Sequence, residues 1–205
     1  MFVIPIYDMI ILPEVTYYFK QDVFRELNLQ EELKEDEEVV FLMLKEDRNR
    51  DEMRPEDFFP IGVSGKVEGI DSEGSVSVRT LGRVDVRAIQ ADVEARSGEQ
   101  DLDAEEAKLR FDKLRTSMLK FIQRFQWGIW ARSYVLHWKN VSEVVSALSA
   151  YLNLTNEEKY AILETDSTRE RFEKMERSVY EFMEIARVGE EAENDQQERH
   201  EKVYR

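Results

Sequence analysis

The spacing of apolar residues changes near residue 103, and this change constrains the fold more than any other feature of the chain. Before it, Ser75–Leu81 alternates small polar with apolar side chains, the period of a strand with one solvent-exposed face. After it, apolar residues recur at steps of three and four, the period of a helix with one buried face. These residues are Phe111, Leu114, Met118, Phe121, Ile122 and Phe125. The sequence therefore predicts an α+β fold, β-rich first and helical afterwards.

Residues 1–90 contain further strand signals. Val39–Leu44 is a short apolar run between charged clusters, and Arg83–Arg87 continues the alternation after Gly82. Asp71–Gly74 has the composition of a hairpin turn. We therefore predict a β-rich subdomain over residues 1–90, followed by a hinge over 91–102, which is rich in Asp, Glu and Gln.

Four helix starts are marked in the second half by a short polar residue with Glu three positions later. The pairs are Asp103 with Glu106, Asn140 with Glu143, Thr155 with Glu158, and Ser167 with Glu170. They predict an antiparallel helical bundle over residues 103–188. The apolar stripe then ends, so we predict that residues 189–205 form a linker and the start of a truncated helix.

The net charge of the chain limits the classes of partner that it can bind. It has 29 Lys and Arg against 44 Asp and Glu, a net charge of −15, which repels phosphate backbones and argues against nucleic-acid binding. It has no cysteine, so disulfides and thiol chemistry are excluded. No apolar run approaches the roughly 18 residues of a membrane span, and the start lacks the basic region of a signal peptide. We expect a cytoplasmic protein without a membrane partner.

No set of residues predicts an active site. The two histidines, His137 and His200, lie far apart in a chain without cysteine, which argues against zinc and against a catalytic triad. Gly62–Gly65 lacks the glycine spacing of a nucleophile elbow and indicates a bulge beside a strand. The acidic run Glu35–Glu38 is typical of a solvated face. We therefore expect no catalytic, cofactor-binding or metal-binding residues.

Residues 111–140 combine basic and aromatic side chains. The basic residues are Lys113, Arg115, Lys120, Arg124, Arg132 and Lys139, and the segment contains all three tryptophans of the chain. Three interpretations remain open. The rings could stack on bases, close the end of the bundle, or form an apolar rim that grips hydrophobic peptide segments.

Four segments resemble the amino-terminal domain of Lon proteases. Ile4–Glu14 is similar to the opening strand of that family, Asp57–Val63 to its D-hydrophobic-aromatic segment, and Gly74–Val84 to its G-x-R-hydrophobic hairpin. Glu158–Glu164, followed by Arg171, Phe172 and Met175, is similar to its E-K-x-x-hydrophobic-L-E pattern. The four appear in the family's order and span residues 3–185. Glu14 stands where the family usually has a glycine.

The resemblance implies a PUA-like β-domain followed by an α-helical bundle. It also implies a noncatalytic domain that selects unfolded, damaged or degradation-tagged proteins and helps a homohexameric, ATP-dependent serine endopeptidase to assemble. ATP and Mg are expected only in an ATPase module, which this sequence does not contain. The alternative is a free-standing adaptor or regulatory protein with the same fold and no protease activity.

Aromatic residues are the candidate contacts for an apolar substrate segment. We select Tyr17, Tyr18, Phe19, Phe58, Phe59, Trp127, Trp130 and Trp138. The competing interpretation for each is burial in the core or at the seam between the halves. Their exposure to solvent distinguishes the two.

Overall fold

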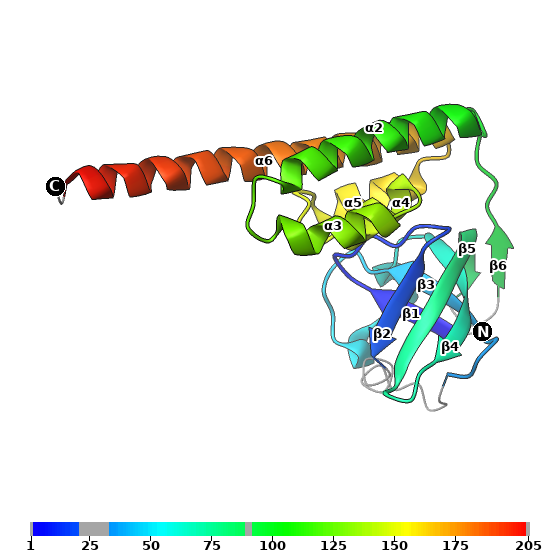
Figure 1. The fold of residues 1–205 in the computed structure, drawn as a ribbon. Helices are drawn as coiled ribbons and strands as arrows, with labels where there is room; N and C mark the ends of the chain where they lie inside the picture. The colour runs from blue at the N-terminus through cyan, green and yellow to red at the C-terminus, as the bar shows by residue number, and fades with distance from the viewer. Residues whose placement is uncertain (1, 21–32, 89–91, 204–205) are drawn as a thin grey trace.

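The computed structural model describes residues 2–20, 33–88 and 92–203, and it confirms the predicted α+β class (Figure 1). A mixed sheet has the order β1-β3-β4-β5-β2, with β6 paired to β5. Only the pairing of β1 with β3 is parallel among the described strands. The strands are β1 (Phe2–Ile6), β2 (Thr16–Lys20), β3 (Glu38–Met43), β4 (Ile61–Ile70), β5 (Ser75–Ala88) and β6 (Asp92–Ala95).

The predicted strands and turn of the β half are confirmed, with one difference. Val39–Leu44 corresponds to β3, whereas the two segments on either side of Gly82 form one long strand, β5. In the turn, the Asp71 carboxylate accepts from the backbone amides of Glu73 (2.9 Å) and Ser75 (2.8 Å). Gly62–Gly65 lies within β4, with a register shift after Ser64, as expected of a bulge.

The helical half begins where the capping residues predicted. The helices are α2 (Ala104–Ile122), α3 (Gly128–His137), α4 (Val141–Ala147), α5 (Asn156–Glu164) and α6 (Thr168–Val203). Asp103, Asn140 and Thr155 accept from amides of the first turns of α2, α4 and α5. The Ser167 hydroxyl does so for α6. Helix α3 has no such side-chain cap and was not predicted.

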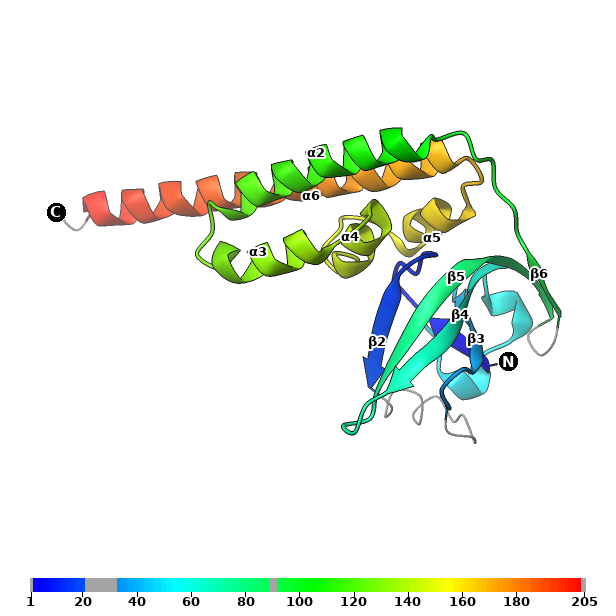
Figure 2. The ribbon, with the colours of Figure 1, turned by 45° about the vertical axis from the view of Figure 1, so that its right-hand side comes forward.

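The bundle is not antiparallel, because its two longest helices run in the same direction (Figures 1 and 2). Near their starts, Arg110 on α2 pairs with Glu176 on α6 (2.5 Å). Near the end of α2, the ring of Phe121 lies 6.1 Å from that of Phe182. The chain returns between them through α3, α4 and α5, a topology that helix periodicity alone does not specify.

The described part of the predicted hinge, residues 92–102, makes contacts with both halves of the fold. Within residues 91–102, β6 extends the sheet, and the Arg96 guanidinium bonds to the carboxylates of Asp85 (2.9 Å) and Asp166 (2.7 Å). One continuous apolar core also includes buried residues of both halves, among them Val78 and Leu114. Residues 92–102 of the predicted hinge are therefore attached both to the sheet and to the start of α6.

The linker predicted from residue 189 lies instead within α6, which continues to Val203. The helix-forming residues of this segment outweigh Gly189, which has open space around it. In the described part of the chain, no helix is both long enough and apolar enough to cross a membrane.

Glu14 adopts a left-handed backbone conformation, with φ of 64°. Glycine takes this conformation without steric cost, so the position favours the glycine that the resembling family usually has there. The turn is held by the Glu14 amide, which donates to the Thr80 carbonyl (3.1 Å).

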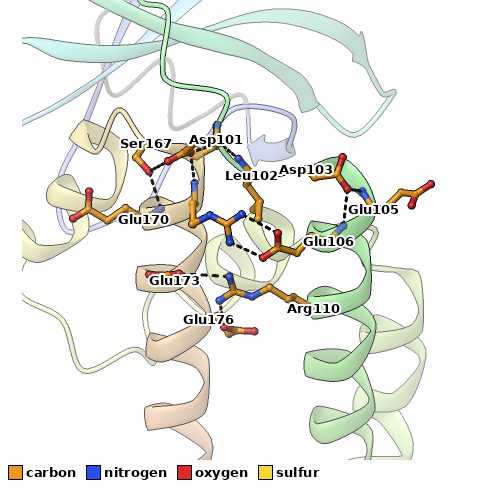
Figure 3. A network of polar contacts seen from close by, with 12 residues as sticks. Asp101, Leu102, Asp103, Glu105, Glu106, Arg110, Ser167, Glu170, Glu173 and Glu176 are labelled. Atoms are coloured by element: carbon orange, nitrogen blue, oxygen red, sulfur yellow. Dashed lines mark hydrogen bonds and ion pairs between the residues drawn. The ribbon is translucent and has the colours of Figure 1, made fainter.

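A polar network joins the first turns of α2 and α6 (Figure 3). Asp101 accepts from the hydroxyls of Ser167 (2.6 Å) and Thr168 (2.9 Å) and from the backbone amide of Arg169 (2.9 Å). The Arg169 guanidinium in turn binds both oxygens of Glu106 (2.6 and 2.8 Å). The bonds from Ser167 and from the Arg169 amide hold the pKa of Asp101 well below its ordinary value.

We predict that Asp101→Asn lowers the melting temperature at pH 7. Because the folded-state pKa is depressed, the stabilisation is complete above the unfolded-state value of 3.8 and is lost as the pH falls through the folded-state pKa. The difference in melting temperature between wild type and variant should therefore shrink progressively below about pH 4.

Circular dichroism at a series of pH values measures this difference. Asp47→Asn is the matched control, because the exposed Asp47 makes no side-chain hydrogen bond or ion pair among residues 2–20, 33–88 and 92–203. A difference for Asp101→Asn that is the same at every pH would contradict the prediction.

Candidate functional site

The largest exposed apolar side chains of the helical half are concentrated on α3. We call this group the α3 aromatic surface; it consists of Ile129, Trp130, Tyr134 and Leu136 on the helix and of Trp127 immediately before it. Ile129 is 82% exposed and Trp130 is 77% exposed. Figures 1 and 2 show α3 beneath the pair of α2 and α6, near the end of α2, whereas α6 extends well beyond it. A group of large apolar side chains exposed on a protein surface is typical of a binding site.

Helix α3 packs through its small residues and exposes its large ones. Gly128 and Val135 are buried and Ala131 is half-buried, and their spacing places all three on one face. A Cβ atom on Gly128 would lie 1.9 Å from the Ile122 carbonyl oxygen, so only glycine permits this approach to the end of α2. An ordinary amphipathic helix does the reverse, burying its aromatic residues.

A row of rings connects the core to this surface. Phe121 is buried and contacts Phe125 edge-on, with 4.9 Å between ring centroids. Phe125 stacks on Trp127 at 4.7 Å, and Trp127 is about half exposed. The Trp127 ring is therefore held in place from below, which lowers the conformational entropy that binding would have to remove.

The tryptophans selected from the sequence fall into two groups. Trp127 and Trp130 belong to the α3 aromatic surface, whereas Trp138 is half-buried against the core. Among the other candidates, Tyr18 on β2 is 76% exposed, but it lies in the β half, apart from α3.

Two candidates are excluded by burial. Tyr17 is buried, and its hydroxyl bonds to the Ser146 hydroxyl (2.7 Å) and accepts from the Leu12 amide (2.9 Å). Burial raises the pKa of Tyr17 to about 12. Phe58 is buried in a small cluster with Leu42 and Leu44. Selecting these two as substrate contacts was therefore wrong.

Phe19 and Phe59 are partly buried. Phe19 stacks on Phe41 with 5.5 Å between ring centroids, and Phe59 stacks on Tyr160 at 4.0 Å. Both rings already have aromatic partners within the fold, so they contribute little free apolar surface.

Sequence reasoning missed three residues of the surface: Ile129, Tyr134 and Leu136. A signal existed, because small residues at 128, 131 and 135 predict a narrow packing face that leaves larger neighbours outside. The basic residues of the same segment are mostly exposed, and Arg115 is paired with Asp112 (2.6 Å). Among the described residues, no group of three or more His, Asp or Glu could hold a metal ion.

We predict that Gly128→Ala destabilises the protein by about 1–3 kcal/mol, the usual range for overpacking a close contact. The added methyl group must push α3 away from Ile122. Gly189→Ala is the matched control, since a Cβ there meets nothing within 4 Å and alanine favours a helix. Denaturant unfolding compares the two variants, and equal stability of both would contradict the close approach.

Comparison with known proteins bears on the whole fold. The family model of the ATP-dependent protease La (LON) substrate-binding domain matches residues 1–179. A Lon protease from Clostridium beijerinckii is 24% identical over 180 residues, covering 82% of this chain and 22% of that protein. The chain thus spans about a fifth of the length of this curated relative.

A solved structure shares the fold. The N-terminal domain of a Mycobacterium avium complex Lon protease matches with a TM-score of 0.52 and 18% identity, covering 87% of this chain and 96% of that one. The resemblance noted in the sequence is thereby confirmed, and the chain belongs to the family of ATP-dependent protease La (LON) substrate-binding domains.

Proposed function

We propose that this chain is the substrate-recognition domain of an ATP-dependent Lon-type serine protease, and that it binds unfolded or degradation-tagged proteins through the α3 aromatic surface. The observation that carries the proposal is the inverted packing of α3, which exposes Ile129 and Trp130 while burying Gly128. A folded protein keeps its apolar side chains inside, so a surface of this kind discriminates in favour of chains that have lost their fold.

In the proposed mechanism, each copy of the domain binds its substrate weakly and several copies bind the same chain. A surface that accepts many sequences cannot be optimised for any one of them, so its affinity for each segment is low. In a homohexameric parent protein, several copies of the domain would engage one unfolded chain, and avidity would supply the retention. ATP and Mg would act in other modules of that cytoplasmic protein, and this domain would help the hexamer to assemble.

The alternative function is a free-standing adaptor or regulatory protein with the same binding surface. The reading frame downstream of Arg205 distinguishes the two, since a protease subunit would continue into an ATPase module with a P-loop. For nucleic acid, the charge of −15 predicts no retention of labelled RNA, even at low salt.

We predict that Trp130→Ser weakens binding of an unfolded protein by about tenfold, because an exposed tryptophan is the kind of anchor that dominates an interface. The probe is reduced, carboxamidomethylated lactalbumin, and binding is measured by fluorescence anisotropy. Since Trp130 is 77% exposed, the free energy of unfolding should change by less than about 0.5 kcal/mol.

Tyr151→Ser is the matched control. Tyr151 is 71% exposed and lies between α4 and α5, outside the α3 aromatic surface. Equal binding by wild type, Trp130→Ser and Tyr151→Ser would contradict the assignment of the surface. No binding by the wild-type protein would contradict the proposed function as a whole.

Analytical ultracentrifugation of this chain tests its proposed role in the assembly of the hexamer. We expect it to be mainly monomeric, because the ATPase module of the parent protein would supply most of the contacts. A stable hexamer formed by these 205 residues would show that they contain the assembly determinants.

A further inference from the structure

A cleft of about 560 Å³ lies where the sheet meets the helical half, separate from the α3 aromatic surface. Its walls come from the loop after β1, from β5, from the segment after β6 and from the helices α2, α4 and α6. Five of its lining side chains are basic and one is acidic; they are Arg83, Arg96, Lys108, Lys139, Arg171 and Glu14. The cleft therefore has the opposite sign to the chain as a whole, whose net charge is −15.

The two innermost arginines are already paired, whereas the other basic groups are not. Arg83 and Arg96 both contact the Asp166 carboxylate, at 3.0 and 2.7 Å. By contrast, the side-chain nitrogens of Lys108, Lys139 and Arg171 make no hydrogen bond or ion pair with any residue that the structure describes. Although the chain as a whole is acidic, three basic side chains of this cleft have no acidic partner in the described part of the chain.

Arg171 is the most unusual of the three, because it is half-buried without a partner. Burial, together with the neighbouring positive charge of Arg83, lowers the pKa of Arg171 to about 10, although the charges of Asp166 and Glu14 act in the opposite direction. The group is therefore still charged at neutral pH. A guanidinium in such a place is destabilising unless an anion compensates it.

Arg83, at the wall of the cleft, is paired with Asp166 through its Nη1 atom and has one unsatisfied nitrogen. Its Nη2 atom is buried and has no hydrogen-bond partner among the described residues. Gly98 covers this atom closely, since a Cβ at that position would lie 2.6 Å from it. Of the three lining arginines, Arg171 is therefore the one without a carboxylate partner among the residues that the structure describes.

The rest of the cleft has a polar part, formed by Gln100, Asn140, Ser142 and Thr168, and an apolar part. The apolar part includes Leu12, Pro13, Leu102, Phe111, Phe172 and Met175. A simple phosphate or a polyphosphate chain would use the cations and leave this apolar wall in contact with water. A peptide segment that carries a carboxylate beside apolar side chains would use both parts.

We propose that this cleft binds an acidic–apolar polypeptide segment, whose carboxylate pairs with Arg171 and whose apolar side chains contact Phe172 and its neighbours. This inference rests on the proposed function, because it gives the substrate a second contact point beyond the α3 aromatic surface. It also assigns selectivity to the domain: among unfolded chains, those with such a segment are retained longest.

Two fluorescent peptides with the same apolar sequence test the proposal, one with glutamates and the other with glutamines in their place. We expect the wild-type protein to bind the glutamate peptide about tenfold more tightly at low salt, as for one charge-assisted contact. Arg171→Gln should abolish this preference without lowering the melting temperature, because it removes a half-buried unpaired charge. A purely structural role for Arg171 would instead lower the melting temperature.

Arg177→Gln is the matched control, since Arg177 is exposed on the same helix and does not line the cleft. It should keep the preference, whereas Lys139→Gln, at an exposed position of the cleft rim, should reduce it. The proposal is overturned if the wild-type protein binds both peptides equally, or if Arg171→Gln retains the preference. Tighter binding of polyphosphate than of the glutamate peptide would also overturn it.

The experiments can contradict the proposed cleft and the proposed recognition of unfolded chains independently. If unfolded lactalbumin binds in a manner sensitive to Trp130→Ser while the two peptides are bound equally, only the cleft is contradicted. If lactalbumin does not bind at all, the proposed recognition of unfolded chains is contradicted.

Discussion

Arg83 extends from β5 into the end of α5, and its guanidinium is the junction between sheet and helices. Only 3% of its side chain is exposed, and its Nη1 atom donates to the carbonyls of Leu163 (3.1 Å) and Thr165 (3.2 Å) and lies 3.0 Å from the Asp166 carboxylate. These carbonyls belong to the last turn of α5, where a helix leaves its acceptors unpaired and where its dipole favours a cation. Because removing the partners of a buried charge is strongly destabilising, these contacts hold β5 and α5 together.

The arrangement of the long helices follows from this junction. Arg96, just beyond β6, shares Asp166 with Arg83, and Asp101 then bonds to the first residues of α6. The chain thus enters α2 beside the start of α6, so both helices leave the sheet in the same direction (Figure 3). Three shorter helices bring the chain from the end of α2 back to the start of α6. The first of them, α3, lies near the end of α2. The position of the exposed aromatic residues is in this sense a consequence of the contacts around Arg83.

The sequence predicted features that depend on neighbouring residues, such as helix caps, but not those that depend on contacts between distant residues. The capping pairs at Asp103 and Thr155 predicted helix starts because the side chain and the amides it accepts from are neighbours in the chain. Helix α3 was missed because it lacks a cap and because its buried face is made of small residues. The burial of Tyr17 and Phe58 depends on partners far away in sequence, as the bond from Tyr17 to Ser146 illustrates, so aromatic character alone could not separate core from surface.

Helix α3 has its packing residues on one face and its exposed large apolar residues on the other. Gly128, Ala131 and Val135 hold it in place, whereas Trp130 and Ile129 contribute almost nothing to the core. Substitutions among the outward residues are therefore nearly invisible to folding, and selection can act on them for binding alone. If this face binds substrates as proposed, it can change over evolutionary time while the backbone stays in place, so related domains can diverge in preference without first acquiring stabilising mutations elsewhere.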